Sequence, residues 1–364
     1  MKFIKKTLSS AMLAACLLFL PVMETATASN PETGLAIAAP VSGQSAQAAA
    51  PSPETHPSAT ATLQEEAQYL TASQLAVKER LLAVLWVYRS AEYRGLCYQA
   101  YNLARMEVDR ALAQRKQEEK TAASHHSPGD GTGNPSRPLA VILDIDETVA
   151  SNVLFETYYL EHPDIKADYR AWEKWLAQGR DLLPGAKDFL KYADSRGIQI
   201  FYITGRGPQD RDVTLSFLRK TGLPLPNAAH LRMNDRSGSK MNHFSALAQR
   251  YDIVCYIGDN AGDFPIGAIR RENKIIKKTQ HTPSSAVKTK QDLPLDITAM
   301  LKQDQNNARN AQVDANRKLF GTKFILLPNP MYGDWEYNLA ENYRRLPPEQ
   351  QIALRKAALK KIRL

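Results

Sequence analysis

The sequence predicts an α/β fold in which a parallel β-sheet is covered by helices on both faces. Two observations indicate this class. Short, almost wholly apolar runs of strand length alternate with longer stretches of helical periodicity from residue 139 onward. Apolar runs without polar alternation are typical of strands buried on both faces, which requires helices on each side of the sheet. With 364 residues, 43% hydrophobic and 23% charged, the chain has room for one large core and an accessory region.

The strands and helices of this sheet are assigned from the apolar pattern. The predicted strands are Leu139–Leu143, Ile198–Ile203, Ile253–Ile257 and Phe324–Leu327. The predicted helices between them are Leu182–Ser195, Asp210–Lys220 and Met241–Arg250. Sheets of this kind bind ligands at the carboxyl ends of their strands. Polar residues that follow the strands are therefore the first candidates for a functional site.

Residues 1–28 have the pattern of a secretory signal peptide. Lys2, Lys5 and Lys6 precede an almost wholly apolar run from Leu8 to Val22, and Ala26-Thr27-Ala28 offers a cleavage site of small residues. The apolar run is too short for a comfortable membrane-spanning helix. We therefore expect an exported, periplasmic protein.

Cys16 allows a second interpretation of the same segment. Leu13-Ala14-Ala15-Cys16 has the form of a bacterial lipoprotein cleavage box, which would anchor the protein to the outer membrane through a lipid on Cys16. The residues after Cys16 stay apolar, where a mature lipoprotein usually turns polar, so cleavage after Ala28 is preferred. Membrane contact is expected only if Cys16 is lipidated. The remaining cysteines, Cys97 and Cys255, do not indicate a disulfide framework.

Composition divides the region before the first strand. Residues 29–62 are dominated by Ala, Ser, Thr, Pro and Gln and are predicted to be a disordered linker. A helical accessory region of one or two long helices is predicted at 63–120. Its spacing places four residues on one face: Tyr93, Leu96, Ala100 and Leu103. A flexible loop is predicted at 121–138, where His125-His126 are expected to be solvated because adjacent side chains point different ways.

The rest of the chain is predicted to form the core and a tail. The core spans 139–336 and contains a small cap or substrate-selecting insert at about 152–184, and residues 337–364 form a basic helical tail. The formal net charge of +9 favours anionic ligands. Lys and Arg are dispersed without an aromatic-basic motif, so no nucleic acid is expected as a partner. No protein partner is predicted.

Candidate chemical groups follow the predicted strands in order. Asp144 and Asp146 follow the first strand, and Thr204-Gly205-Arg206 follows the second. Lys240 precedes a predicted helix, and Gly258-Asp259-Asn260-Ala261-Gly262-Asp263 follows the third strand. Each group alone could simply end a strand or cap a helix. Together they place polar groups at strand exits and helix starts, where a metal or an anion is bound.

This order resembles the haloacid-dehalogenase superfamily of phosphotransferases. The sequence is more closely similar to the class C acid phosphatases of the bacterial lipoprotein e type, which include 5′-nucleotidases. Four segments carry the resemblance: Trp86–Arg94, Leu143–Thr148, Gly258–Phe264 and Lys323–Glu336. The resemblance implies a Rossmann-like parallel sheet with an N-terminal helical extension and a small cap. Family members often have Ser-Asn at Thr204-Gly205 and a second Asp at Gly262, changes that remove no required functional group.

The residue types at these positions fit phosphomonoester hydrolysis. Asp144 is the expected nucleophile, which becomes an aspartyl phosphate. Asp146 is the expected acid and base, which protonates the leaving alcohol and then deprotonates water. Thr204 and Lys240 are expected to stabilise the transferring phosphoryl oxygens.

The expected cofactor is Mg²⁺, because a carboxylate that attacks a phosphate dianion needs a cation to neutralise the developing charge. The predicted ligands are the side chains of Asp144 and Asp259 and the main-chain carbonyl of Asp146, with water in the remaining positions. Asp263 is expected to act from the outer shell or through water.

The expected substrates are nucleoside monophosphates. Trp172 and Tyr332 are predicted to form a slot for the base, and Arg206 is a further predicted substrate-binding residue. Trp175 is expected to pack on the core, an interpretation that stays open for Trp172 as well. The alternative function is a non-catalytic envelope protein that captures haem or a nucleotide on the same fold.

Overall fold

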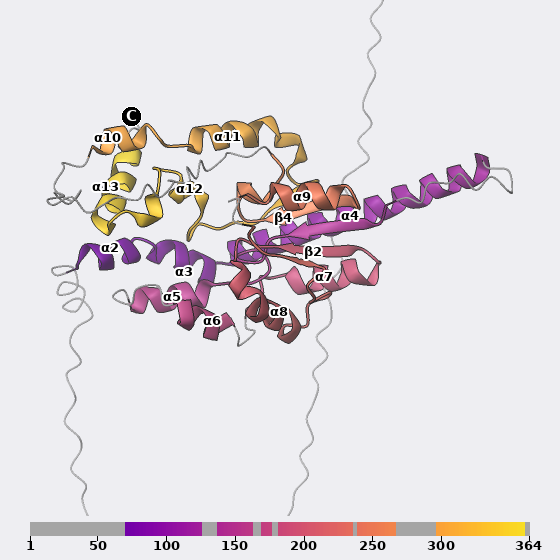
Figure 1. Cartoon of the computed structure of the whole chain (residues 1–364), viewed down its shortest axis with the longest axis horizontal. Helices are drawn as coiled ribbons and strands as arrows, with labels where there is room; N and C mark the ends of the chain where they lie inside the picture. Colours follow the sequence, from indigo (N-terminus) through magenta and orange to yellow (C-terminus); the bar gives the residue numbers. More distant parts are fainter. Residues whose placement is uncertain are drawn as a thin grey trace, which may run out of the picture. The chain divides into compact units, whose positions relative to one another are not determined.

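Five parallel strands form the central sheet, in the order β3-β2-β1-β4-β5. Figure 1 labels β2 and β4 among them. They are β1 (Leu139–Leu143), β2 (Gln199–Ile203), β3 (Leu231–Arg232), β4 (Asp252–Gly258) and β5 (Phe324–Leu326). The predicted α/β class is confirmed, and all four predicted strands are present. β3 was not predicted because a strand of two residues is too short to show an apolar pattern.

The structure, a computed structural model, describes residues 70–125, 137–162, 169–176, 181–235, 239–266 and 296–360. All of them belong to one unit, Ser58–Leu364. The predicted signal peptide, the Cys16 lipidation site and the predicted linker lie outside the described residues. No helix in the described ranges combines the length and the apolar content that crossing a bilayer requires.

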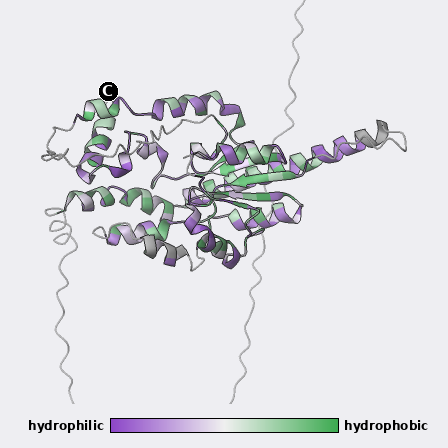
Figure 2. Cartoon of the chain, viewed as in Figure 1, coloured by the Kyte–Doolittle hydropathy of each residue, from purple (hydrophilic) through white to green (hydrophobic). Residues whose placement is uncertain are grey.

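Successive side chains of β1 enter two different cores, as strand geometry requires. Val141 and Leu143 pack in a core with helices from the N-terminal region, whereas Ala140 and Ile142 pack in a second core on the opposite face. Figure 2 shows the strands as continuously hydrophobic ribbons between helices with mixed faces. Both faces of the sheet are therefore covered, as the sequence predicted.

Helices connect the strands on these two faces. Between β1 and β2 lie α5 (Val153–Glu161), α6 (Tyr169–Leu176) and α7 (Ala186–Ser195). Between β2 and β4 lie η1 (Pro208–Asp210), α8 (Arg211–Lys220) and α9 (Met241–Ala248), with β3 between the last two. Between β4 and β5 lie η2 (Ala261–Asp263), α10 (Ile297–Leu301), α11 (Asn306–Ala315) and η3 (Arg317–Leu319). After β5 come α12 (Asp334–Tyr337), η4 (Tyr343–Arg345) and α13 (Pro348–Leu359).

The region before β1 folds into three helices, α2 (Ala72–Lys78), α3 (Leu81–Arg89) and α4 (Ala91–His125). The buried face of α4 includes Tyr93 and Ala100, as predicted, but Leu96 is 40% exposed. The buried stripe instead consists of Tyr93, Cys97, Ala100, Tyr101, Ala104 and Val108. Small side chains on this stripe let α4 lie close to the sheet, and an apolar pattern alone does not distinguish them from surface alanines. The helical accessory region thus contributes directly to the larger core.

The ends of two other predicted segments also differ. Helix α4 continues through His125, beyond the predicted start of the loop at residue 121, and His126 lies outside the described residues. The predicted basic tail packs as part of the fold, because Tyr343 and Leu354 belong to a third apolar core. Arg355 of α13 forms ion pairs with Glu79 and Glu336, at 2.5 and 3.0 Å.

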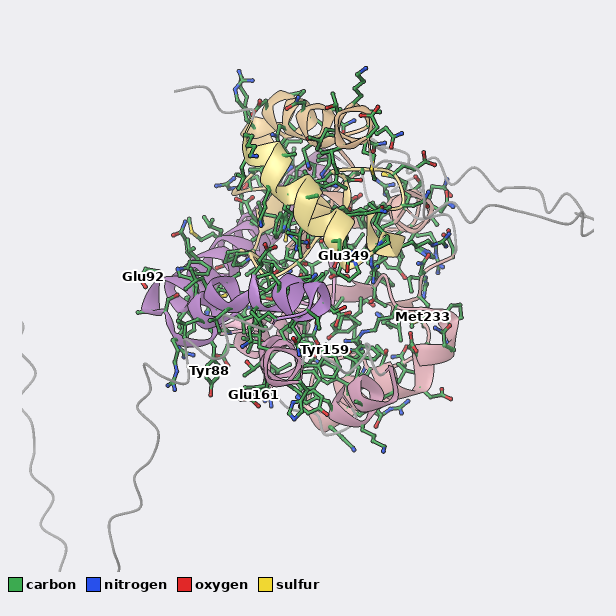
Figure 3. All side chains as sticks on the ribbon, turned by 90° about the vertical axis from the view of Figure 1, so that its left-hand side faces the viewer. Tyr88, Glu92, Tyr159, Glu161, Met233 and Glu349 are labelled. Carbon is green, nitrogen blue, oxygen red and sulfur yellow. The ribbon has the colours of Figure 1, made fainter. Side chains whose placement is uncertain are left out.

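The N-terminal and C-terminal helices lie side by side. Helix α13 contacts α2, and the view of Figure 3 shows the C-terminal helix with Glu349 above the N-terminal helices, while Tyr159 of α5 lies below them. Glu336, buried at the start of this region, accepts a hydrogen bond from the Tyr343 hydroxyl at 2.9 Å. The C-terminal segment is therefore fixed in place beside the carboxyl ends of the strands.

Candidate active site

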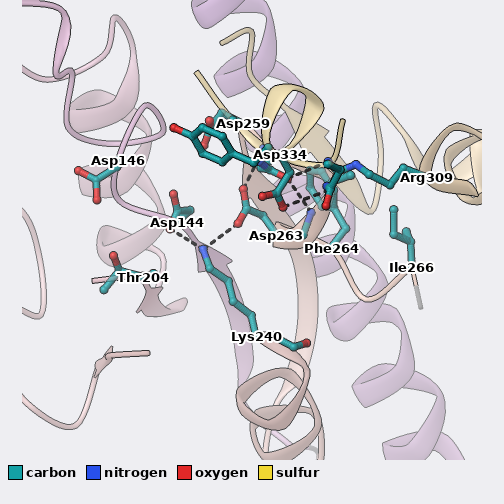
Figure 4. A pocket seen from close by; sticks show the side chains of 18 of the residues that line it. Asp144, Asp146, Thr204, Lys240, Asp259, Asp263, Phe264, Ile266, Arg309 and Asp334 are labelled. Carbon is teal, nitrogen blue, oxygen red and sulfur yellow. Dashed lines mark hydrogen bonds and ion pairs between the residues drawn. The ribbon is translucent and has the colours of Figure 1, made fainter. Parts of the chain in front are cut away.

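A cavity of about 380 Å³ opens at the carboxyl ends of β1, β2 and β4. Asp144, Thr204 and Asp259 follow these three strands directly and all line the cavity. Lys240, just before α9, and Asp263 of η2 complete the group (Figure 4). The parallel sheet thus brings together residues that are more than a hundred positions apart in the sequence.

Three carboxylates form one cluster in this cavity. Asp144, Asp259 and Asp263 each offer an oxygen, and these oxygens lie within 4.8 Å of one another. Asp263 approaches the end of β4 closely because Gly258 has no side chain, and a Cβ there would lie 2.3 Å from the Asp263 Cβ. Asp263 is thus a third potential ligand in the same cluster, in addition to its predicted outer-shell role.

Lys240 is the cation that the structure pairs with this cluster. Its Nζ donates to Asp144 and, at 2.7 Å, to Asp263. Burial acts to lower the pKa of Lys240, but the two carboxylates raise it above its usual value. Lys240 therefore stays charged and supplies one positive charge to three acidic groups.

The carboxylates are under-compensated by that single charge. Burial raises the pKa of Asp144 to about 7, with Lys240 opposing the rise and Asp263 adding to it. Burial and the neighbouring carboxylates also raise the pKa of Asp259 well above its usual value. Hard oxygen ligands that repel one another fit a divalent cation, which would restore their ionised forms.

Asp146 lies to one side of this cluster, in a different environment (Figure 4). Arg206 donates to both of its oxygens, from Nε at 2.9 Å and from Nη2 at 2.7 Å, and the Asn152 amide donates at 3.0 Å. Burial acts to raise the pKa of Asp146, but the Arg206 charge and these hydrogen bonds outweigh it and lower the pKa. Asp146 is thus held as an anion.

Arg206 occupies a different place from the predicted one. Its guanidinium is buried, donates to the Thr214 hydroxyl at 3.1 Å and stacks 5.0 Å from the Trp172 ring centre. Neither Arg206 nor Trp172 is among the residues that line the cavity. Arg206 was predicted to contact the substrate, but in the structure it pairs with Asp146, and the Trp172 ring packs against its guanidinium. Of the predicted slot, Tyr332 alone lines the cavity.

Tyr332 is anchored by a residue that sequence reasoning missed. Its hydroxyl donates to Glu147 at 2.9 Å and accepts from the Asn152 amide at 3.0 Å. Glu147 is buried, has a left-handed backbone with φ of 54°, and also accepts from the Asn152 main-chain N–H at 2.8 Å. Burial raises the pKa of Glu147 to about 8, against the effect of these hydrogen bonds. Its position immediately after Asp146 was the available signal.

Other contacts orient the cluster. The Asn329 amide donates to Asp259 at 2.9 Å, and the Thr148 hydroxyl donates to the same carboxylate at 3.3 Å. Arg309 of α11 bonds Asp334 at 3.1 Å and Asn260 at 3.0 Å, which ties the loop after β4 to the start of α12. Asn329 and Asp334 lie in a string already singled out in the sequence. Arg309 had no such signal.

Comparisons with known proteins agree with this geometry. The model of a family described as HAD superfamily, subfamily IIIB (acid phosphatase), matches residues 47–335. Among solved structures, the class C acid phosphatase from Bacillus anthracis is similar at 28% identity and a TM-score of 0.60, over 79% of this chain and 99% of that one. The same enzyme with tungstate bound gives 26% identity and a TM-score of 0.58, over 80% of this chain and 100% of that one.

Proposed function

The chain belongs to the acid phosphatases of HAD superfamily subfamily IIIB and is a phosphoric monoester hydrolase, and we propose that it is an exported, Mg²⁺-dependent 5′-nucleotidase. Membership of this enzyme family argues against the alternative function, a non-catalytic ligand-capture protein. The observation that carries the proposal is the contrast between two aspartates two residues apart: Asp144 in an under-compensated carboxylate cluster and Asp146 paired with Arg206.

The first step needs a nucleophile beside a cationic site. The Asp144 carboxylate attacks the phosphorus, the bond to the ester oxygen breaks, and the phosphoryl group is transferred to Asp144. Thr204 is buried at the end of β2 and lines the cavity, and Lys240 carries its charge toward Asp144. Both can bind the transferring phosphoryl oxygens.

Asp146 acts as general acid in the first step and as general base in the second. It gives its proton to the departing alcohol, then takes one from the water that hydrolyses the aspartyl phosphate and releases phosphate. The Arg206 pair lowers the pKa of Asp146, so protonation for the first step is favoured at acidic pH. This agrees with the acid phosphatase class of the family.

A divalent cation is supported by the chemistry of the donor set. Asp144, Asp259 and Asp263 could hold it with the main-chain carbonyl of Asp146, and oxygen ligands favour Mg²⁺ over softer metals. When bound, the cation would neutralise the charge that develops between nucleophile and phosphate. One lysine alone leaves that charge uncompensated.

Two observations support a nucleotide as substrate. The cavity is large enough for a ligand beyond a single phosphate, and Tyr332, an aromatic residue with a fixed hydroxyl, forms part of its wall. Stacking tolerates different bases, so several nucleoside monophosphates should react. The tungstate in the related structure shows that a phosphate-like oxyanion binds that protein, which agrees with a phosphate site here.

Export is proposed from the signal-like residues 1–28, with the Cys16 lipid anchor as the alternative route. An exported nucleotidase would convert nucleotides that cannot cross a membrane into nucleosides that can be imported. The mass of the protein isolated from its native host tests this, because a mature chain beginning at about Ser29 and a diacylated chain beginning at Cys16 differ in mass. An intact N-terminus would contradict export by either route.

A phosphate-release screen tests the catalytic proposal. Phosphate release is measured for four esters: AMP, nicotinamide mononucleotide, glycerol phosphate and p-nitrophenyl phosphate. Each is assayed in the presence of EDTA and again after Mg²⁺ or Ca²⁺ is restored. We expect loss of all turnover with EDTA, recovery with Mg²⁺, and kcat/KM for the nucleotides at least about tenfold above that for glycerol phosphate. Full activity after metal depletion would contradict the cation, and equal kcat/KM for all esters would contradict the nucleotide.

A further inference from the structure

The cavity has a second wall, built from the C-terminal part of the chain. Besides the catalytic residues, it is lined by Arg309 and by Tyr337, Asn338 and Arg344. Figure 4 shows Arg309 on the side of the cavity away from Asp146. The family model ends at residue 335, so the last three of these residues lie beyond the region that defines the family. These three residues come from the part of the chain that follows the match to the family model.

Arg344 differs from the other arginine of this wall. Arg309 is neutralised by Asp334 at 3.1 Å. Arg344 has no carboxylate within ion-pair distance in the described part of the chain; its guanidinium carbon lies 4.9 Å from the centre of the Tyr337 ring. A cation over an aromatic face keeps all its N–H donors available in the ring plane for an anion. The wall therefore presents one uncompensated positive charge to the cavity.

The backbone that carries Arg344 is held in place. Tyr343 is buried, and its hydroxyl donates to Glu336 at 2.9 Å and accepts from Arg355 at 2.6 Å. Burial raises the pKa of Tyr337, so its ring stays a neutral phenol beside the guanidinium. Arg344 is itself exposed, but it projects from a turn that packs on both sides. The positive charge thus has a defined position at the rim of the cavity.

We propose that Arg344, oriented by Tyr337, is a subsite for a second anionic group on the substrate. The preferred substrates are then phosphomonoesters that carry another phosphate or carboxylate remote from the ester that is cleaved, such as nucleoside bisphosphates. This rests on the proposed function, which places the reacting phosphate at Asp144. The planar guanidinium matches such an anion with two parallel hydrogen bonds.

The surrounding charges favour an anion at this position. Asp334, an acidic residue that lines the same wall, is paired with Arg309. The aspartates at the catalytic end would be compensated by Lys240 and by a bound cation. A neutral substrate end would leave Arg344 solvated and gain nothing from it.

The test compares adenosine 3′,5′-bisphosphate with AMP, which share the base and sugar and differ by one phosphate. The ratio of their kcat/KM values is measured at fixed free Mg²⁺ for the wild type, Arg344→Gln and Arg345→Gln. Arg345 is an exposed neighbour that does not line the cavity, so it controls for loss of overall charge. Whichever phosphate reacts, the other one is the remote anion.

We expect Arg344→Gln to lower the ratio by about fivefold to tenfold, through KM for the bisphosphate, the size typical of a partly exposed charged contact. Rates on AMP and on p-nitrophenyl phosphate should not change, and Arg345→Gln should leave the ratio unaltered. An unchanged ratio in Arg344→Gln, or an equal fall in both variants, would overturn the subsite. A lower kcat/KM for AMP than for glycerol phosphate would contradict the nucleotide proposal alone. The bisphosphate-to-AMP ratio would still test Arg344, so the two failures can be told apart.

Discussion

The two ends of the catalytic cavity hold the same residue type in opposite electrostatic environments. At one end, Asp144 shares a cluster with Asp259 and Asp263, with Lys240 as the one paired cation among the described residues, and burial raises the pKa of Asp144 to about 7. At the other end, Asp146 receives two hydrogen bonds from Arg206, and its pKa is lowered despite burial.

The difference shows how one short loop after β1 can carry two roles. A nucleophile in an under-compensated cluster requires a cation before it can ionise fully, which couples attack to metal binding. An acid and base that is paired with arginine keeps a defined orientation and titrates at lower pH. The neighbours, rather than the aspartates themselves, separate the two functions.

The largest expected effect comes from Asp144→Asn. The amide is nearly isosteric but is not a competent nucleophile, so kcat should fall by ~10³-fold or more on every substrate. Steady-state phosphate release measures this, with circular dichroism to verify the fold. Activity above a tenth of wild type would remove Asp144 from the role of nucleophile.

Asp146→Asn should act differently from Asp144→Asn, because its effect depends on the leaving group. Loss of acid and base help should slow alkyl phosphates by ~10²–10⁴-fold. The phosphorylation step with p-nitrophenyl phosphate, whose leaving group needs little protonation, should change far less in a pre-steady-state burst. Equal losses of the burst rate on both esters would contradict the general-acid role.

Arg206→Gln tests what holds Asp146 apart from the cluster. Without the guanidinium, the pKa of Asp146 should rise. Asp146 must be protonated for the first step and ionised for the second, so the acidic and the alkaline limb of the pH–rate profile should both move to higher pH. We expect kcat to fall by about tenfold at the wild-type optimum. Arg211→Gln, an exchange on the neighbouring helix, is the matched control. An unshifted profile would mean that Arg206 merely packs against Trp172.

The metal-free protein should lose stability as pH rises from about 4 to 7. In that window the folded state holds a proton on Asp144, whose folded pKa is about 7, more tightly than the unfolded state does. Unfolding is therefore favoured by rising pH, and Tm should fall by about 5 °C. Saturating Mg²⁺ should remove most of this slope. A Tm that rises with pH in the metal-free protein would contradict the raised pKa of the buried Asp144 carboxyl.

Glu147→Gln should have the smallest effect. The pKa of Glu147 is raised to about 8, so its carboxyl is largely protonated at neutral pH, and the amide oxygen of Gln can still accept from Asn152 and Tyr332. Activity should stay within about threefold of wild type. Because the pKa of Glu147 is raised, its protonation also makes the folded state less stable as pH rises from about 4.5 to 8. Mg²⁺ should not remove this loss of stability, whereas Glu147→Gln should abolish it. A loss of activity as large as that of Asp146→Asn would mean that Glu147 acts as an anion.

Much of the sheet and the gathering of the candidate site were predictable, because strands β1, β2 and β4 are almost wholly apolar and parallel topology fixes where their ends meet. The pairing of Arg206 with Asp146 was not, since it depends on side-chain positions of residues 60 apart in the sequence. The buried face of α4 was predicted only in part, because Leu96 is exposed and small buried residues such as Ala104 carry no strong apolar signal. The packing of the C-terminal helices was not predicted, because their many Lys and Arg residues suggested an exposed tail.

The most direct test of the division between the two aspartates is to trap the phosphorylated enzyme. Asp146→Asn is mixed with p-nitrophenyl phosphate and Mg²⁺, quenched in acid and analysed by peptide mass spectrometry. We expect one phosphoryl group on Asp144, at higher occupancy than in the wild type because hydrolysis of the intermediate is slowed. A phosphoryl group on any other residue, or turnover by Asp146→Asn without a phosphorylated Asp144, would contradict the assignment.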